Sequence, residues 1–150
     1  WCVFDCFMTG GGGLLILKGI HDVEDAKLAA DSGADALIVS NHGGRQLDGA
    51  QSSIEALPSI VDAVGSRIEI HMDGGIRSGQ DVLKARALGA RGVYIGRPML
   101  YGLGAMGEEG VSKCLQILHK ELDITMAFCG HTNIETVDKS ILLPGTYPTA

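Results

Sequence analysis

A histidine and an arginine lie close together in the segment Ser40-Asn41-His42-Gly43-Gly44-Arg45-Gln46-Leu47-Asp48. A histidine can act as a general base near neutral pH, and a guanidinium can bind a carboxylate through two parallel hydrogen bonds. The intervening glycines permit a turn tight enough for both side chains to face one ligand. Because the segment follows an aliphatic run, we interpret His42 as a base and Arg45 as a carboxylate anchor, and not as polar residues that merely cap a loop.

Two further glycine-containing segments each carry an arginine. Asp73-Gly74-Gly75-Ile76-Arg77-Ser78-Gly79 leads into a predicted helix, and Gly96-Arg97 follows the next aliphatic run. Backbone amides at a helix start, the helix dipole and a guanidinium together favour an anion such as a phosphate. No G-x-G-x-x-G fingerprint of dinucleotide-binding domains directly follows a predicted strand, which disfavours NAD. Lys18 ends another apolar run, where position alone makes a ligand-facing cation and a surface lysine equally plausible.

These segments must be positioned by an alternation of short aliphatic runs and helical patterns. The aliphatic runs are residues 14–17, 36–39, 68–72 and 92–95, and helix starts are indicated at Asp22, Ser52, Ser78 and after Pro98. Such alternation predicts parallel strands with helical crossovers, and the chemically important segments all follow strand ends. Glycine loops after the last two strands resemble the phosphate site that barrels build after their seventh and eighth strands. We therefore predict an α/β fold, the C-terminal half (about four βα units) of a TIM (β/α)8 barrel.

The chain divides into three predicted regions. Residues 1–13 form an irregular N-terminal segment that ends in a run of glycines, residues 14–130 form the half-barrel, and residues 131–150 form a C-terminal tail with weak periodicity. The chain begins with Trp1, and we expect it to be a fragment of a longer protein.

Composition excludes several classes of function. The net charge is −6 and no stretch is rich in lysine or arginine, so we do not expect nucleic-acid binding. Cys2, Cys6, Cys114 and Cys129 show no spacing typical of zinc ligands, so no metal site is predicted. No apolar run approaches the roughly 20 residues of a membrane span. We expect a cytoplasmic protein with reduced thiols.

Four segments, in this order and spacing, resemble the signatures of the FMN-dependent 2-hydroxy-acid oxidases and dehydrogenases. They are LILKGI at residues 15–20, SNHGGRQLD at 40–48, DGGIRSG at 73–79 and IGRP at 95–98. That family includes glycolate oxidase, L-lactate dehydrogenase and oxidase, and mandelate dehydrogenase. The resemblance implies FMN as the cofactor and the oxidation of an L-2-hydroxy acid, such as lactate or glycolate, to the 2-oxo acid. It also implies oxygen, a quinone or a cytochrome as electron acceptor, and a homotetramer.

The resemblance implies a role for each matched position. His42 is the base that takes a proton from the α-carbon or the hydroxyl of the substrate, and Arg45 holds the substrate carboxylate. Lys18 lies by the N1 and O2 edge of the flavin, where it stabilises the anionic reduced ring, and Ser40 contacts the flavin. The ribityl chain and phosphate are bound by Asp73, Gly74, Gly75, Ile76, Arg77, Gly96 and Arg97.

Two departures from the family pattern leave alternatives open. Residues 10–13 are glycines where the family has a short turn with proline, and the family's N-terminal half is missing. That half supplies further flavin contacts, a substrate-binding tyrosine, a second arginine and the aspartate that orients the base, so we expect the isolated chain to be inactive. The alternatives are a flavin-free TIM-barrel enzyme that binds a phosphorylated substrate, and a non-catalytic truncated remnant. Peripheral membrane association or a peroxisome-type compartment also stays open.

Overall fold

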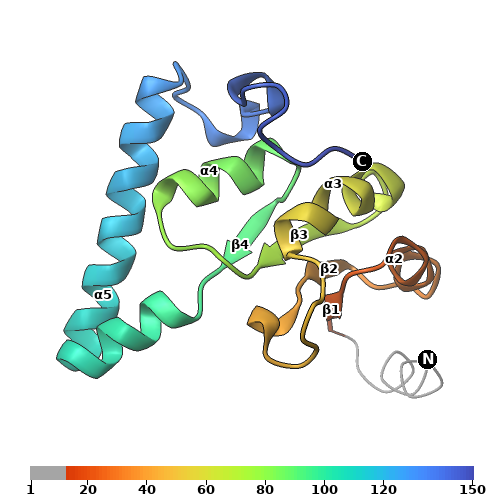
Figure 1. Cartoon of the computed structure of the whole chain (residues 1–150), viewed down its shortest axis with the longest axis horizontal. Helices are drawn as coiled ribbons and strands as arrows, with labels where there is room; N and C mark the ends of the chain where they lie inside the picture. Colours follow the sequence, from red (N-terminus) through yellow and green to blue (C-terminus); the bar gives the residue numbers. More distant parts are fainter. Residues whose placement is uncertain (1–12) are drawn as a thin grey trace.

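Four parallel strands pair in chain order in the computed structural model, which describes residues 13–150. They are β1 (Ile16–Ile20), β2 (Ala36–Val39), β3 (Glu69–Asp73) and β4 (Gly92–Tyr94). Parallel neighbours require crossovers, which are supplied by α2 (Val23–Asp31), α3 (Ser53–Val64) and α4 (Gly79–Ala87). Figure 1 shows these helices following one another along one side of the strands. The predicted α/β fold with parallel strands is confirmed.

The helix starts follow from local side-chain caps. The side chain of Asp22 accepts hydrogen bonds from the amides of Glu24 and Asp25 at the start of α2. A capping box, in which the serine and an acidic side chain satisfy each other's backbone amides, opens α3 at Ser52 and α4 at Ser78. All three starts were predicted, because capping depends on residues only two or three positions apart.

The first strand differs from its prediction. The aliphatic pattern indicated residues 14–17, whereas β1 spans Ile16–Ile20 and pairs Lys18 with Ile38 of β2. Backbone pairing in a parallel sheet is indifferent to side-chain polarity, so the strand continues through the lysine. The register shifts between Lys18 and Ile20, at Gly19, which has a φ of +94°.

The hydrophobic core lies between the sheet and helices α2, α3 and α4. Leu37 and Val39 of β2 and Met72 of β3 are at most 1% exposed, and they pack with Leu57 and Ile60 of α3. Burying a side chain of this size stabilises the fold by about 1.5–3 kcal/mol. The alternate residues of β3 turn to the opposite face of the sheet, so the core fixes which strand residues point away from the helices.

The last helix and the segment after it pack against α4. Helix α5 (Arg97–Phe128) has a break at Gly107, and its second arm packs Leu122 and Met126 against α4. The segment predicted as a C-terminal tail contains two short turns, Ile134–Thr136 and Lys139–Ile141. Val137 between them is buried against Leu83 of α4. Within residues 13–150, no helix combines the length and apolar character needed to cross a bilayer.

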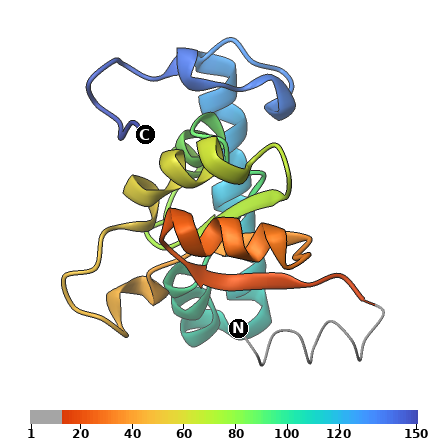
Figure 2. The ribbon, with the colours of Figure 1, turned by 90° about the vertical axis from the view of Figure 1, so that its right-hand side faces the viewer.

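The sheet has two open edges among the described residues. Strand β1 pairs only with β2, and β4 pairs only with β3. Figure 2 shows β1 in front of the other strands, as an edge strand. A closed eight-stranded barrel has no such edges, so this sheet has the form of a partial barrel. The predicted irregular segment lies, except for Gly13, outside the described residues.

Candidate active site

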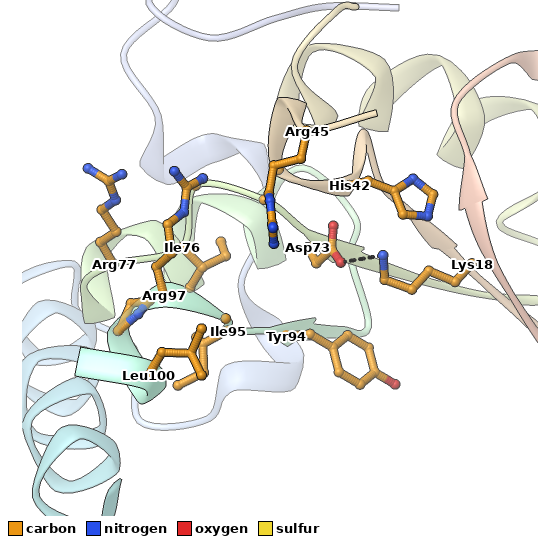
Figure 3. Close-up of a pocket in the computed structure, with 15 residues that line it drawn as sticks. Lys18, His42, Arg45, Asp73, Ile76, Arg77, Tyr94, Ile95, Arg97 and Leu100 are labelled. Atoms are coloured by element: carbon orange, nitrogen blue, oxygen red, sulfur yellow. Dashed lines mark ion pairs between the residues drawn. The ribbon is translucent and has the colours of Figure 1, made fainter. Parts of the chain in front are cut away.

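The carboxyl ends of the four strands surround one pocket, shown in Figure 3. All predicted site residues except Ser40 line it: Lys18, His42, Arg45, Asp73, Gly74, Gly75, Ile76, Arg77, Gly96 and Arg97. These residues come from four separate segments of the chain. They meet because the carboxyl ends of parallel strands lie at the same edge of a sheet.

Lys18 makes two polar contacts at the rim of this pocket. Its Nζ donates to Ser40 Oγ at 2.9 Å and forms an ion pair with Asp73 Oδ2, also at 2.9 Å. Ser40 is 1% exposed, and lies behind the lining residues instead of among them. The second carboxylate oxygen of Asp73, Oδ1, is buried and has no hydrogen-bond partner among residues 13–150. An ammonium has three N–H groups, so Lys18 keeps one for a ligand.

His42 lies in a tightly held turn, the short 3-10 segment His42–Gly44. Its φ is +55°, in the left-handed region, which costs a non-glycine residue roughly 1–2 kcal/mol. Its backbone amide donates to Ser40 Oγ at 3.1 Å, so one buried hydroxyl contacts both Lys18 and the backbone of His42. The turn therefore aims the imidazole from a backbone conformation that surrounding hydrogen bonds maintain.

The imidazole of His42 lies directly over Gly19. A Cβ atom at position 19 would come within 2.6 Å of His42 Cε1, closer than real Cβ contacts allow. Gly19 thus serves two purposes: it accommodates a φ of +94° and leaves room for the base.

Three arginines approach the pocket, two from loops and one from the start of α5. Figure 3 shows Arg45, Arg77 and Arg97 on the same side of the Lys18–Asp73 ion pair. A Cβ atom built at Gly43 would lie 3.5 Å from Nη2 of Arg97, so this guanidinium reaches over the turn that carries His42. Within the described residues, none of the three arginines forms a salt bridge with a carboxylate. The pocket therefore carries an excess of positive charge, which favours an anionic ligand.

The start of α4 differs from the expectation that its amides are open to a phosphate. The amide of Gly79 donates to Glu121 Oε2 of α5 at 2.9 Å, and the amide of Asp81 donates to Ser78 Oγ at 3.2 Å. The two helices approach so closely at Gly79 that a Cβ there would overlap the backbone of Leu122. The carboxylate of Glu121 thus accepts the hydrogen bond of the Gly79 amide, which the sequence pattern predicted to be available to a phosphate.

Several residues at the site were missed by sequence reasoning. Tyr94, Ile95, Pro98 and Leu100 line the pocket from β4 and α5. Ile95 and Pro98 lie within the IGRP segment, which was a usable signal. Tyr94 and Leu100 had no signal, because an exposed aromatic or aliphatic side chain has no distinctive spacing.

Comparisons with known proteins agree with this arrangement. A family model for FMN-dependent dehydrogenases matches residues 8–144. An L-lactate dehydrogenase of Caulobacter sp. is 51% identical over 142 residues, which cover 95% of this chain and 37% of that protein. An L-lactate oxidase of Nostoc sp. is 52% identical, covering 85% of this chain and 35% of the relative. The 2-hydroxyacid oxidase 1 of Homo sapiens is 46% identical, with the same coverage.

A solved structure of a mandelate oxidase superposes on the chain with a TM-score of 0.89 at 46% identity. It covers 91% of this chain, whereas the chain covers 41% of the mandelate oxidase. The chain therefore spans little more than a third of the length of the curated relatives described above. The match to these barrels confirms the predicted partial-barrel architecture.

Proposed function

The chain belongs to the family of FMN-dependent dehydrogenases, and on that premise we propose that it forms the flavin-holding, base-carrying part of an enzyme that oxidises an L-2-hydroxy acid to the 2-oxo acid. The observation that carries the proposal is the single pocket in which Lys18, His42 and Arg45 meet. They would supply an ammonium for a cofactor that gains negative charge, a base and a carboxylate anchor. The names of the relatives, L-lactate dehydrogenase, L-lactate oxidase and 2-hydroxyacid oxidase, support this substrate class.

The chemistry of the pocket suits FMN, which has an anionic phosphate, a polyol chain and an electron-accepting ring. Arg77 and Arg97 have no carboxylate partner among residues 13–150, and would bind the phosphate. The buried Oδ1 of Asp73 would accept a hydrogen bond from a ribityl hydroxyl. Gly75 has a φ of +83° and open space where a side chain would begin, so its backbone permits close approach of a ligand. Bound FMN would supply the acceptor for the two electrons that leave the substrate.

His42 and Arg45 would share the work on the substrate. The guanidinium of Arg45 would bind the carboxylate through two hydrogen bonds and so fix the orientation of the α-carbon. The imidazole of His42 would take a proton from the α-carbon or from the hydroxyl of the substrate. The turn between them is short, so both groups would reach the same small molecule from one loop.

Lys18 would oppose negative charge that develops in the pocket. Its ammonium is already held by Ser40 and Asp73 at 2.9 Å each, so it need not reorganise during the reaction. Fixed donors aimed at developing charge are the largest single contribution to many enzymatic rate accelerations.

The resemblance also supports the remaining features of the proposal. We infer oxygen, a quinone or a cytochrome as the electron acceptor, a homotetramer as the assembly and the cytoplasm as the location. Residues that supply the rest of the substrate site would come from the part of the barrel outside this chain, so turnover would require the complete polypeptide. A flavin-free enzyme acting on a phosphorylated substrate would leave the pairing of His42 with Arg45 without a joint purpose, and we do not favour it.

The test uses the complete polypeptide that carries this chain at the length of its relatives. Purified protein should contain FMN, seen by its absorbance, and anaerobic addition of L-lactate, glycolate or L-mandelate should bleach the flavin band. D-lactate serves as the control substrate, because it presents its α-hydrogen on the wrong face for a fixed base. Absence of FMN, or a flavin that none of these acids reduces, would contradict the proposed function.

A further inference from the structure

Every backbone amide at the start of the turn that carries His42 has an acceptor within the protein. The amide of Asn41 donates to Ser53 Oγ at 3.1 Å, that of His42 to Ser40 Oγ at 3.1 Å, and that of Gly43 to Asn41 Oδ1 at 3.0 Å. Side-chain oxygens therefore replace the regular backbone pairing that this irregular turn lacks. Of these acceptors, Ser53 is the one that comes from outside the loop and its strand.

Ser53 lies at the junction of two loops. It is the first residue of α3 and is 2% exposed. Its Oγ would lie 3.0 Å from a Cβ atom built at Gly74, so it also packs against the loop after β3. The same position at Gly74 is 3.4 Å from Asn41 Oδ1. The hydroxyl of Ser53 is thus enclosed between the turn of the base and the loop assigned to the cofactor.

Ser53 does not owe this position to capping its helix. The N-cap of α3 is its neighbour Ser52, whose hydroxyl and backbone amide both contact Glu55 Oε2, at 2.6 and 3.0 Å. A buried serine that does not cap its own helix, yet accepts a hydrogen bond from Asn41 at the far end of the preceding loop, needs an explanation of its own.

We propose that Ser53 is a positioning residue, which holds the amide of Asn41 and thereby keeps the left-handed backbone of His42 in place against the loop containing Gly74. The catalytic part of this inference rests on the proposed function of His42 as a base. Without the Ser53 hydroxyl, the amide of Asn41 loses its acceptor in a partly buried environment and the turn can relax. A displacement of the base by about 1 Å is enough to slow proton removal by about 100-fold.

The experiment compares three variants of the complete flavoprotein with the parent. Ser53→Ala removes the hydroxyl, Ser53→Thr keeps it, and Ser52→Ala weakens the same helix start without touching the turn. Hydrogen exchange of the segment 40–44 is measured first, because it needs no turnover. The rate of anaerobic flavin reduction at saturating L-2-hydroxy acid is measured next, together with FMN content.

Ser53→Ala is expected to speed exchange in segment 40–44 and to slow flavin reduction by about 10- to 100-fold while FMN stays bound. Both Ser52→Ala and Ser53→Thr should match the parent in the hydrogen exchange of segment 40–44 and in the rate of flavin reduction. Unchanged hydrogen exchange of segment 40–44 in Ser53→Ala would overturn the inference. It would also be overturned if Ser52→Ala or Ser53→Thr changed exchange and rate as much as Ser53→Ala does. If no hydroxy acid reduces the parent, the proposed function fails, and the exchange comparison still decides whether Ser53 holds the turn.

Discussion

Lys18 at β1 and Asp73 at the end of β3 form an ion pair, with Nζ and Oδ2 2.9 Å apart, across the end of the intervening strand β2. The lysine side chain is 42% exposed and the aspartate side chain 18%. Such an arrangement keeps the ammonium in place and partly offsets its charge. The negative charge of Asp73 therefore reduces the electrostatic attraction of Lys18 for an anion in the pocket.

The first prediction concerns the reduction potential of the flavin. Lys18→Met in the complete protein should lower the two-electron potential, because the ammonium no longer stabilises negative charge on the reduced ring. Asp73→Asn keeps a hydrogen-bond acceptor but removes the offsetting charge, so it should raise the potential. A charge-assisted hydrogen bond of about 1.5–3 kcal/mol corresponds to about 30–60 mV for a two-electron couple. Dye-coupled reductive titration measures the potentials of both variants, and Lys27→Met, at an exposed lysine, is the control. Equal potentials in all variants would contradict the assignment of Lys18 to the flavin.

The second prediction tests the space above Gly19. Gly19→Ala should slow flavin reduction strongly, because the new methyl would come within 2.6 Å of His42 Cε1. Gly49→Ala is the matched control: its φ is also positive, at +74°, but nothing lies within 4 Å of the new methyl. Both variants should lose about 1–2 kcal/mol of stability from backbone strain, measured by urea unfolding. Only Gly19→Ala should lose turnover, and equal rates in the two variants would show that the imidazole does not depend on this space.

A third prediction separates phosphate binding from ring binding. Arg77→Ala or Arg97→Ala should weaken FMN by about 1.5–3 kcal/mol, roughly a tenfold to hundredfold change in Kd. Riboflavin lacks the phosphate, so its affinity should be unchanged in both variants. Fluorescence titration of the apoprotein measures the dissociation constants of FMN and of riboflavin for each variant. The control is Arg67→Ala, because Arg67 forms an ion pair with Asp31 outside the pocket. Loss of riboflavin affinity to the same extent would argue against the phosphate assignment.

The fourth prediction distinguishes the base from the carboxylate anchor. His42→Gln should reduce the rate of anaerobic flavin reduction by about 100- to 10,000-fold, with FMN retained. Arg45→Lys keeps the charge but loses the bidentate geometry, so it should chiefly weaken the binding of substrate and of simple carboxylate inhibitors. Stopped-flow reduction with L-lactate, glycolate and L-mandelate separates the two effects. A His42 variant that reacts at the parental rate would rule out its role as base, and an Arg45 variant of undiminished affinity would rule out the anchor.

The fifth prediction follows from the cap of α3. Hydrogen bonds from the Ser52 side chain, and next from its backbone, lower the pKa of Glu55 below its usual 4.5. A carboxyl group with a lowered pKa in the folded protein adds stability above its unfolded pKa, and this contribution is lost as the pH falls through the folded value. Ser52→Ala should therefore destabilise the protein more at pH 7 than at pH 3, as judged by urea midpoints. A carboxyl NMR titration should show the pKa of Glu55 returning toward 4.5 in the variant. An unchanged Glu55 titration would contradict the capping account.

The sequence by itself determined the order of the elements and most of the chemistry-bearing loops. The helix starts are predictable from the capping residues Asp22, Ser52 and Ser78, because a cap and the amides it binds are only two or three residues apart. The alternation of strands and helices then requires parallel pairing, which brings the loops after the strands to one edge. For that reason the sequence alone places His42 and Arg97 near one pocket.

Only the tertiary structure decided how those loops hold one another. Two contacts join residues from different βα units: the ion pair of Lys18 with Asp73, and the space that Gly19 leaves for His42. The hydrogen bond from Asn41 to Ser53 joins the two ends of one long loop. Glu121 of α5 is a further case, since it accepts a hydrogen bond from the amide of Gly79 at the start of α4. Local spacing carries no signal for such contacts, because they depend on how the crossovers set each strand end against its neighbours in three dimensions.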